Sequence, residues 1–283
     1  GPVIRSSLNR PRIVQPCSPF FGESLMIRNL FTALVLLALA APSFATTLVG
    51  RAVSPSGDLG VNSFVSDTDY TIPGDMFGIR STATPGTPGL PFAIQDVSPD
   101  FGDSQGIIDD APGSVDDDPF FGVVDTVNGS GTDVNTATWE FDISSVISNL
   151  SVSIDFAAMG DFEDPGDFFD FEYAIDGAPL QPLFTSSINE DTDQAYTMAD
   201  GTGVVLDDPV LINGTLLSNS FVTLSETIAG TGTTLELVFS AEANGGSEAF
   251  AFRNVEVTGV IPEPASVALL GLGGLALLRR RSA

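Results

Sequence analysis

The 283-residue sequence contains no histidine and no lysine, and its single cysteine is Cys17. These absences exclude a histidine-based catalytic triad, a histidine-ligated metal site and a lysine Schiff base. One cysteine forms neither an intramolecular disulfide nor a cysteine-only zinc site. The formal net charge of −27 argues against nucleic-acid binding, because that function needs a basic surface against the phosphates.

A secretory signal peptide is predicted at residues 26–45. A short segment containing Arg28 precedes the apolar stretch 30–41, and small residues before the end of the segment predict cleavage after Ala45. As a helix, the 12-residue apolar stretch would rise only about 18 Å, too little for a hydrocarbon core of about 30 Å. Residues 1–25 lie upstream of this signal and are interpreted as a non-native segment.

The C-terminal segment 262–283 has three parts. A largely apolar run of 14 residues separates a proline-rich motif from a basic cluster, and these two parts are Pro262, Glu263 and Pro264, and Arg279, Arg280 and Arg281. The run is short for a membrane span, but the arginines can extend it by snorkelling and favour the cytoplasmic side. The segment therefore predicts a membrane-directed transmembrane helix, with the bulk of the chain outside.

This three-part tail resembles the PEP-CTERM sorting signal of Gram-negative bacteria. The resemblance covers only about the last 22 residues and implies recognition and cleavage by an exosortase, a membrane-embedded transpeptidase-like enzyme. It implies a protein that is membrane-anchored until the tail is processed and then lies at the cell surface or in a biofilm matrix. Extracellular polysaccharide is then a candidate partner. The fold and chemistry of the exported region are not implied.

The exported region, residues 46–261, carries 35 acidic residues and three arginines. Apolar and polar residues alternate with a period of two through its second half, which predicts half-buried strands near residues 139–143, 152–156, 169–175, 235–239 and 250–257. The last of these has a bulge signal at Arg253-Asn254. Looser strands are expected at residues 61–65, 92–97 and 120–127.

Short strands separated by turn signals predict an all-β fold, an antiparallel β-sandwich or jelly roll. A single domain over residues 46–261 is favoured, and a smaller N-terminal module that ends near residue 135 is the alternative. Segments 151–177 and 248–259 also resemble secreted jelly-roll modules of the concanavalin-like or carbohydrate-binding type. That resemblance rests on pattern alone and implies a fold rather than a function.

The densest acidic cluster is residues 161–172, where six of 12 side chains are carboxylates. Four of these lie in a Pro/Gly-containing loop before the predicted strand: Asp161, Glu163, Asp164 and Asp167. Ca²⁺ takes six to eight oxygen ligands, and clustered loop carboxylates supply such ligands. The spacing does not match an EF-hand, and acidic runs are commonly only solvated surface. A calcium site and a plain acidic surface both remain open.

Two classes of function also remain. One is a non-enzymatic surface or matrix protein, and the other is a secreted carbohydrate-binding module or a carboxylate-dependent glycan hydrolase. Sugar-binding grooves usually offer exposed aromatic rings, but the alternation predicts that the only tryptophan, Trp139, is in the core. An exposed Trp139 or Tyr173 beside two carboxylates would favour the second class. The Asn213-Gly214 pair matches a glycosylation sequon but is interpreted as a hairpin turn.

Overall fold

The computed structural model describes residues 45–67, 76–80, 118–127, 134–197, 203–245 and 248–262. The chain divides into two compact units, residues 1–43 and 44–283, and all of the described residues belong to the second. Strands are the regular elements of these ranges, which contain no helix. The predicted strand 92–97 lies outside the described residues.

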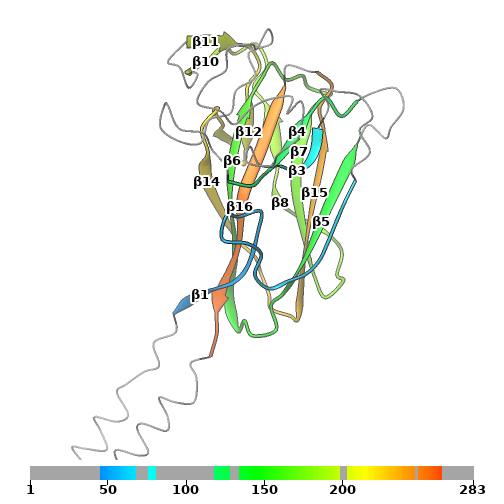
Figure 1. The fold of residues 1–283 in the computed structure, drawn as a ribbon, viewed down its shortest axis with the longest axis vertical. Helices are drawn as coiled ribbons and strands as arrows, with labels where there is room; N and C mark the ends of the chain where they lie inside the picture. The colour runs from blue at the N-terminus through cyan, green and yellow to red at the C-terminus, as the bar shows by residue number, and fades with distance from the viewer. Residues whose placement is uncertain are drawn as a thin grey trace, which may run out of the picture. The chain divides into compact units, whose positions relative to one another are not determined.

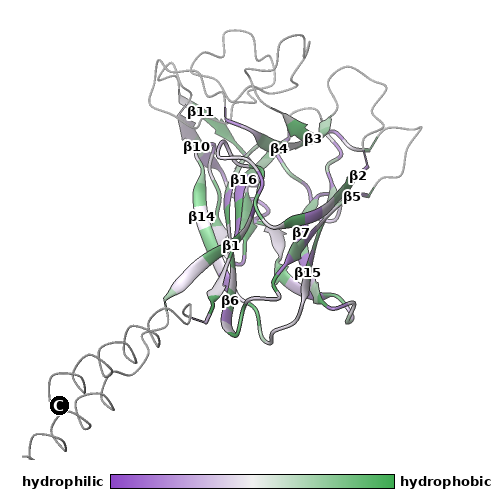
Figure 2. Cartoon of the chain, turned by 60° about the horizontal axis from the view of Figure 1, so that its bottom comes forward, coloured by the Kyte–Doolittle hydropathy of each residue, from purple (hydrophilic) through white to green (hydrophobic). Residues whose placement is uncertain are grey.

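Two large antiparallel sheets form the body of the domain, and Figure 2 shows them as two layers. The order of the first sheet is β14 (Val222–Thr227), β6 (Ser148–Met159), β16 (Ala249–Val260), β4 (Phe120–Val124) and β3 (Met76–Arg80), and β1 (Thr46–Ala52) also pairs with β16. The order of the second is β2 (Val61–Ser66), β5 (Asn135–Asp142), β15 (Thr234–Glu242), β7 (Phe168–Ile175) and β8 (Gln181–Phe184).

Two small sheets accompany the sandwich. One is the hairpin β10 (Gln194–Thr197) and β11 (Gly203–Leu206), and the other has the order β13 (Thr215–Leu216), β12 (Val210–Ile212) and β9 (Ser186–Ile188). Asn213 and Gly214 join β12 to β13 with φ angles of 47° and 76°, the backbone that a tight hairpin turn requires. The turn interpretation of this sequon is therefore confirmed.

The core lies between the inner faces of the two large sheets and combines aliphatic side chains with a network of aromatic rings. Trp139 is 1% exposed; it stacks on Phe64 with a centroid distance of 4.8 Å and meets Phe121 and Phe252 edge-on. Burying one such side chain contributes about 1.5–3 kcal/mol. The alternation that predicted the strands places these rings on one face, so the all-β sandwich expected from the sequence is confirmed.

The second-half strands predicted from alternation correspond to β5, β6, β7, β15 and β16. The expected bulge is also present, because the pairing of β16 with β6 shifts register between Arg253 and Glu256. In the first half, β2 and β4 were predicted, whereas β1 and β3 were not. Strands from both sides of residue 135 share sheets: β2 pairs with β5, and β4 pairs with β16.

Strands β16 and β6 are the longest of the described strands. The 12 residues of β16 span about 40 Å at roughly 3.3 Å per residue. Strand β6 borders one side of it, while β4 and then β1 border the other. Ala249 lies opposite Met159 at one end, and Val260 lies opposite Thr46 and Ser148 at the other, which is the lower end of Figure 1.

Candidate metal site

Three carboxylates meet at the end of the sandwich where β16 begins. Glu163 and Asp167 lie in the loop between β6 and β7, and Glu248 directly precedes β16. One oxygen from each lies within 4.8 Å of the others. Asp167 is 7% exposed and Glu248 is 2% exposed, whereas Glu163 faces solvent. We call these three residues the acidic triad.

Backbone amides hold two of the three carboxylates in place. Asp167 accepts a hydrogen bond from the amide of Glu163 at 2.7 Å and another from the amide of Asn244 at 2.9 Å. Glu248 accepts one from the amide of Gly245 at 2.8 Å. The loop after β6 and the connection after β15 are thus tied together through the triad, so the positions of its oxygens depend on both segments.

Packed aromatic rings stand next to the triad residues in the sequence. Phe169 stacks on Phe250 with a centroid distance of 4.2 Å, and Phe162 meets Phe169 edge-on at 5.6 Å. All three rings are fully buried. Each ring lies one or two residues from a triad residue in the sequence. The two buried carboxylates, Asp167 and Glu248, are therefore each followed two residues later by a fully buried ring.

This surrounding raises two pKa values. Burial, followed by the neighbouring Asp167 carboxylate, raises the pKa of Glu248 to about 8. Burial also raises the pKa of Asp167 to about 6, although hydrogen bonds from the amides of Glu163 and Asn244 partly lower it. Carboxyl groups that are desolvated and crowded in this way are stable only when a proton or a cation neutralises them. The ion pairs found among the described residues join Arg253 to Asp118 and Asp155, not to the triad.

The structure brings together only two of the four ligands suggested by the sequence. Glu163 and Asp167 belong to the triad, but Asp161 and Asp164 do not. The amide of Asp164 is instead bonded to the Glu190 carboxylate at 2.6 Å, and the Asp161 charge acts on Asp207. Metal binding itself stays a prediction.

Sequence reasoning missed Glu248, which is 81 residues away from Asp167. A signal was available, because Glu248 is the acidic first residue of the predicted closing segment 248–259. In one sheet β16 pairs with β6, and in the other β15 pairs with β7. Only this topology explains why the start of β16 meets the acidic loop between β6 and β7.

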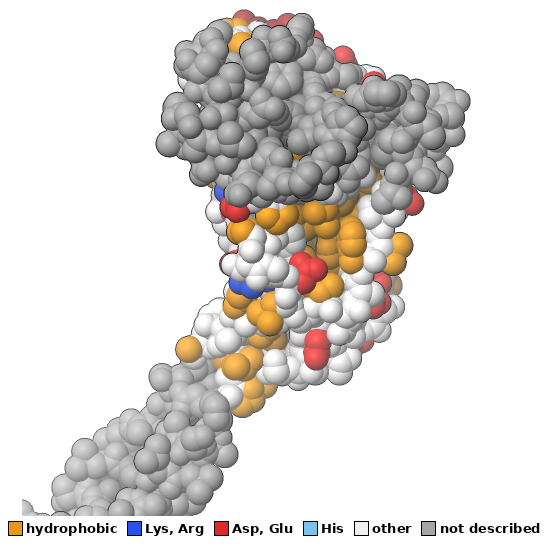
Figure 3. All heavy atoms as spheres, viewed as in Figure 1, with side chains coloured by type: hydrophobic (Ala, Val, Ile, Leu, Met, Phe, Trp, Pro, Cys, Tyr) orange, Lys and Arg blue, Asp and Glu red, His pale blue; other side chains and the backbone are white. Residues whose placement is uncertain are grey.

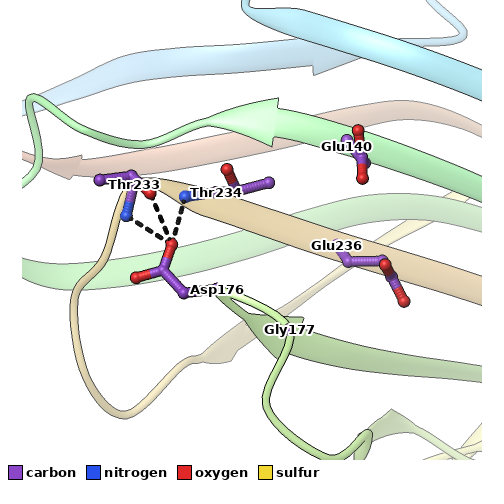
Figure 4. Close-up of a pocket in the computed structure, with 6 residues that line it drawn as sticks. All are labelled: Glu140, Asp176, Gly177, Thr233, Thr234 and Glu236. Atoms are coloured by element: carbon purple, nitrogen blue, oxygen red, sulfur yellow. Dashed lines mark hydrogen bonds between the residues drawn. The ribbon is translucent and has the colours of Figure 1, made fainter.

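A second acidic site is an open pocket of about 380 Å³ on the outer face of the other sheet, shown in Figure 4. Glu140 on β5 and Glu236 on β15 are register partners there, so two like charges lie side by side. Asp176 lies at the edge of the pocket and accepts hydrogen bonds from the amide and hydroxyl of Thr233 and the amide of Thr234. Asp176 therefore holds a turn in place, and the described residues that line the pocket include no aromatic ring.

The two aromatic residues considered as sugar-binding platforms, Trp139 and Tyr173, differ in burial. Trp139 is buried, as the alternation predicted, and Tyr173 is half-buried on β7 beside the core. Figure 3 shows acidic side chains distributed over the visible described face, with few basic ones among them. The buried tryptophan removes the best candidate platform for a sugar ring.

The two processing segments lie mostly outside the described residues. Ala45 and Pro262 are described, and the remaining sorting residues are not: Glu263, Pro264, Arg279, Arg280 and Arg281. Across the described ranges, no helix is long and apolar enough to span a membrane. The predicted transmembrane tail falls outside those ranges.

A protein-family model identifies the tail. The PEP-CTERM protein-sorting motif matches residues 260–282. The chain is thus an all-β protein that carries a PEP-CTERM sorting signal, as the tail predicted. Such signals mark exported proteins of Gram-negative bacteria and imply processing by an exosortase. The match covers the C-terminal end only and leaves the exported domain unassigned.

The other comparisons add little. No curated protein matches the chain. The chain is similar to the enzymatically active domain of tailspike protein 4 of bacteriophage CBA120, at 10% identity and a TM-score of 0.25, over 77% of this chain and 19% of that one. It is also similar to the CBM22-1 xylan-binding domain of Xyn10C from Paenibacillus barcinonensis, at 8% identity and a TM-score of 0.19, over 51% and 83%. TM-scores this low support no argument about function.

Proposed function

We propose that this protein is an acidic, non-enzymatic component of the cell surface or of an exopolysaccharide or biofilm matrix. In this proposal the β-sandwich is the exported domain, and an exosortase processes the tail. A divalent cation, Ca²⁺, is bound by the acidic triad and links the loop after β6 to the start of β16. The observation that carries the cation assignment is the meeting of Asp167 and Glu248 in a buried position.

The electrostatics of the triad support a cation. Carboxylates whose oxygens lie within 4.8 Å of one another repel when they are ionised, and the pKa of about 8 for Glu248 reflects its burial and the neighbouring Asp167 charge. Ca²⁺ prefers carboxylate oxygens and accepts irregular geometry, with water completing its shell. The exposed Glu163 leaves one side open to that water. Mg²⁺ fits less well, because it needs near-octahedral geometry and gives up its water reluctantly.

The residue inventory supports a non-enzymatic role. The sequence offers no histidine or lysine for acid–base or nucleophilic catalysis, and its cysteine lies upstream of the exported region. Trp139 is buried, so the domain lacks the ring that would most readily bind a sugar. These features favour a structural or matrix role over a catalytic one.

Localisation tests the export part of the proposal. The chain should reach the surface of a Gram-negative host that has the sorting enzyme, whereas replacement of Pro262, Glu263 and Pro264 by alanine should trap it in the cell envelope. Replacement of Arg279, Arg280 and Arg281 by serine should do the same. The unmodified chain in a strain without the enzyme is the control. Unchanged surface display of both variants would contradict the proposal.

The alternative is a glycan-binding or glycan-cleaving domain, and its residues would be Glu140 and Glu236 in the open pocket. Paired carboxylates carry out glycoside hydrolysis when they flank the bond. A glycan array with the purified chain tests this alternative. Binding or cleavage that Glu140→Gln and Glu236→Gln both remove would replace the non-enzymatic proposal.

A further inference from the structure

The sorting motif begins where a buried strand ends. Val260 is the last residue of β16 and is 4% exposed, because it is paired on both sides, with Thr46 on β1 and with Ser148 on β6. The amide of Ile147 also donates a hydrogen bond to the Val260 carbonyl at 2.8 Å. The end of β16 is therefore an interior position of a sheet, not a free strand end.

Both predicted processing points lie at this end of the sandwich. The matched sorting motif starts at Val260, and Pro262 follows after a single intervening residue. On the neighbouring strand, Thr46 directly follows Ala45, where the signal peptide is predicted to be cut. Paired residues of antiparallel strands have Cα atoms only about 5 Å apart. The two processing points are thus adjacent, although they are more than 200 residues apart in the sequence.

The short distance to the motif limits access for an enzyme. Residues 261 and 262 reach at most about 7 Å from the paired end of β16, since an extended chain spans roughly 3.3–3.6 Å per residue. An enzyme that takes several residues in extended form on both sides of the motif would have to include residues of β16. Those residues are hydrogen-bonded in the folded domain, where β1 covers one side of the strand.

We infer that β1 acts as a latch on the sorting motif, so that the exosortase engages the chain only after the β1–β16–β6 end opens locally. This inference rests on the proposed sorting of the tail. When opening and closing are fast, processing of a transiently opened segment follows the population of the open form. The rate of tail removal is therefore set by how firmly β1 pairs with the end of β16.

A disulfide across the latch tests this inference in the full chain, with Cys17→Ser to remove the other thiol. Leu48 and Thr258 are register partners on β1 and β16, and the variant Leu48→Cys with Thr258→Cys would hold the two strands together. The matched control places the bond elsewhere, with Glu172→Cys and Val238→Cys on β7 and β15. A third variant inserts eight Gly/Ser residues, with an average reach of about 16 Å, between Ile261 and Pro262.

Tail removal is followed by pulse-chase in a host with the sorting enzyme. The latch disulfide should slow removal about tenfold or more relative to the control disulfide, and a tenfold change corresponds to about 1.4 kcal/mol of opening free energy. The Gly/Ser insertion should speed removal of the tail. In the chain that also carries the latch disulfide, the insertion should restore the rate of tail removal.

Two results would overturn the latch, and they differ from a failure of sorting itself. Equal rates for the latch and control disulfides would show that no opening is needed. An insertion without effect, alone and combined with the disulfide, would show that access does not limit processing. If the unmodified chain kept its tail in the same host, the proposed function would be wrong instead.

Discussion

Asp167 and Glu248 place carboxylate oxygens within 4.8 Å of each other although both side chains are buried. The contact joins the loop between β6 and β7 to the residue that opens β16, and backbone amides of Asn244 and Gly245 support it. Burial, followed by the Asp167 carboxylate, raises the pKa of Glu248, and a proton or a cation would relieve that repulsion. The ion pairs found among the described residues lie elsewhere, at Arg253.

Residues 46–261 should fold without the two processing segments. All of the strands in the described part of the chain lie between Thr46 and Val260, and they enclose the core. The expected result is a cooperative thermal transition of the purified fragment, followed by circular dichroism. The shorter fragment 136–261 should fail to fold cooperatively, because it lacks β1, β2, β3 and β4. Cooperative folding of that shorter fragment would favour a domain boundary near residue 135.

Trp139→Ala should destabilise the domain by about 3–5 kcal/mol, the usual cost of removing a large aromatic side chain from a core. Trp139 is 1% exposed and lies against Phe121 and Phe252. Urea unfolding followed by circular dichroism measures the loss. Phe64→Ala is the control, because its ring stacks on the same indole but is 41% exposed, so its loss should cost clearly less. Equal small losses would show that Trp139 is not a core residue.

Asp176 predicts a dependence of stability on acid pH. Hydrogen bonds from the Thr233 hydroxyl and then from the amides of Thr234 and Thr233 lower the pKa of its carboxyl. A carboxyl whose pKa is lower in the folded than in the unfolded state adds stability above its ordinary pKa of about 3.9, and that contribution is lost as the pH falls through the folded value.

The melting temperature of Asp176→Asn should therefore lie below that of the unmodified chain at pH 6, and the difference should shrink as the pH falls below about 4. Asp58→Asn serves as the matched control for the removal of one exposed carboxylate. A difference that stays constant from pH 6 to pH 2 would show that the ionised form of Asp176 does not hold the turn.

The sequence predicted the strands whose two faces differ in polarity. Along β5 and β15, and along the first parts of β6 and β7, every second side chain enters the core, and this period can be seen without a structure. Strands of three or four residues, such as β9 and β12, are too short to show a period. Strand β1 was missed because its pairing with β16 shifts register between Leu48 and Gly50, which interrupts the alternation.

The sequence predicted some residues of the candidate site and missed another. Glu163 and Asp167 stand close together in an acidic loop, so composition alone points to them. Glu248 joins them through sheet topology, which places the start of β16 beside the end of β6. Asp161 and Asp164 share the loop but lie outside the triad. Local density of charge therefore indicated the region, while the choice of ligands required the pairing of distant strands.

The most direct test of the proposed cation site is the melting temperature of the purified full-length chain in CaCl₂, compared with NaCl and MgCl₂ at matched ionic strength. Extracellular Ca²⁺ modules bind at roughly 10⁻⁴–10⁻³ M, and about 100 times the dissociation constant would add about 2.7 kcal/mol of stability. Ca²⁺ should raise the melting temperature beyond the other two salts. Glu248→Gln should remove this increment, and Asp161→Asn with Asp164→Asn should keep it. Equal stabilisation by NaCl, or an increment that survives in Glu248→Gln, would contradict a calcium site in the acidic triad.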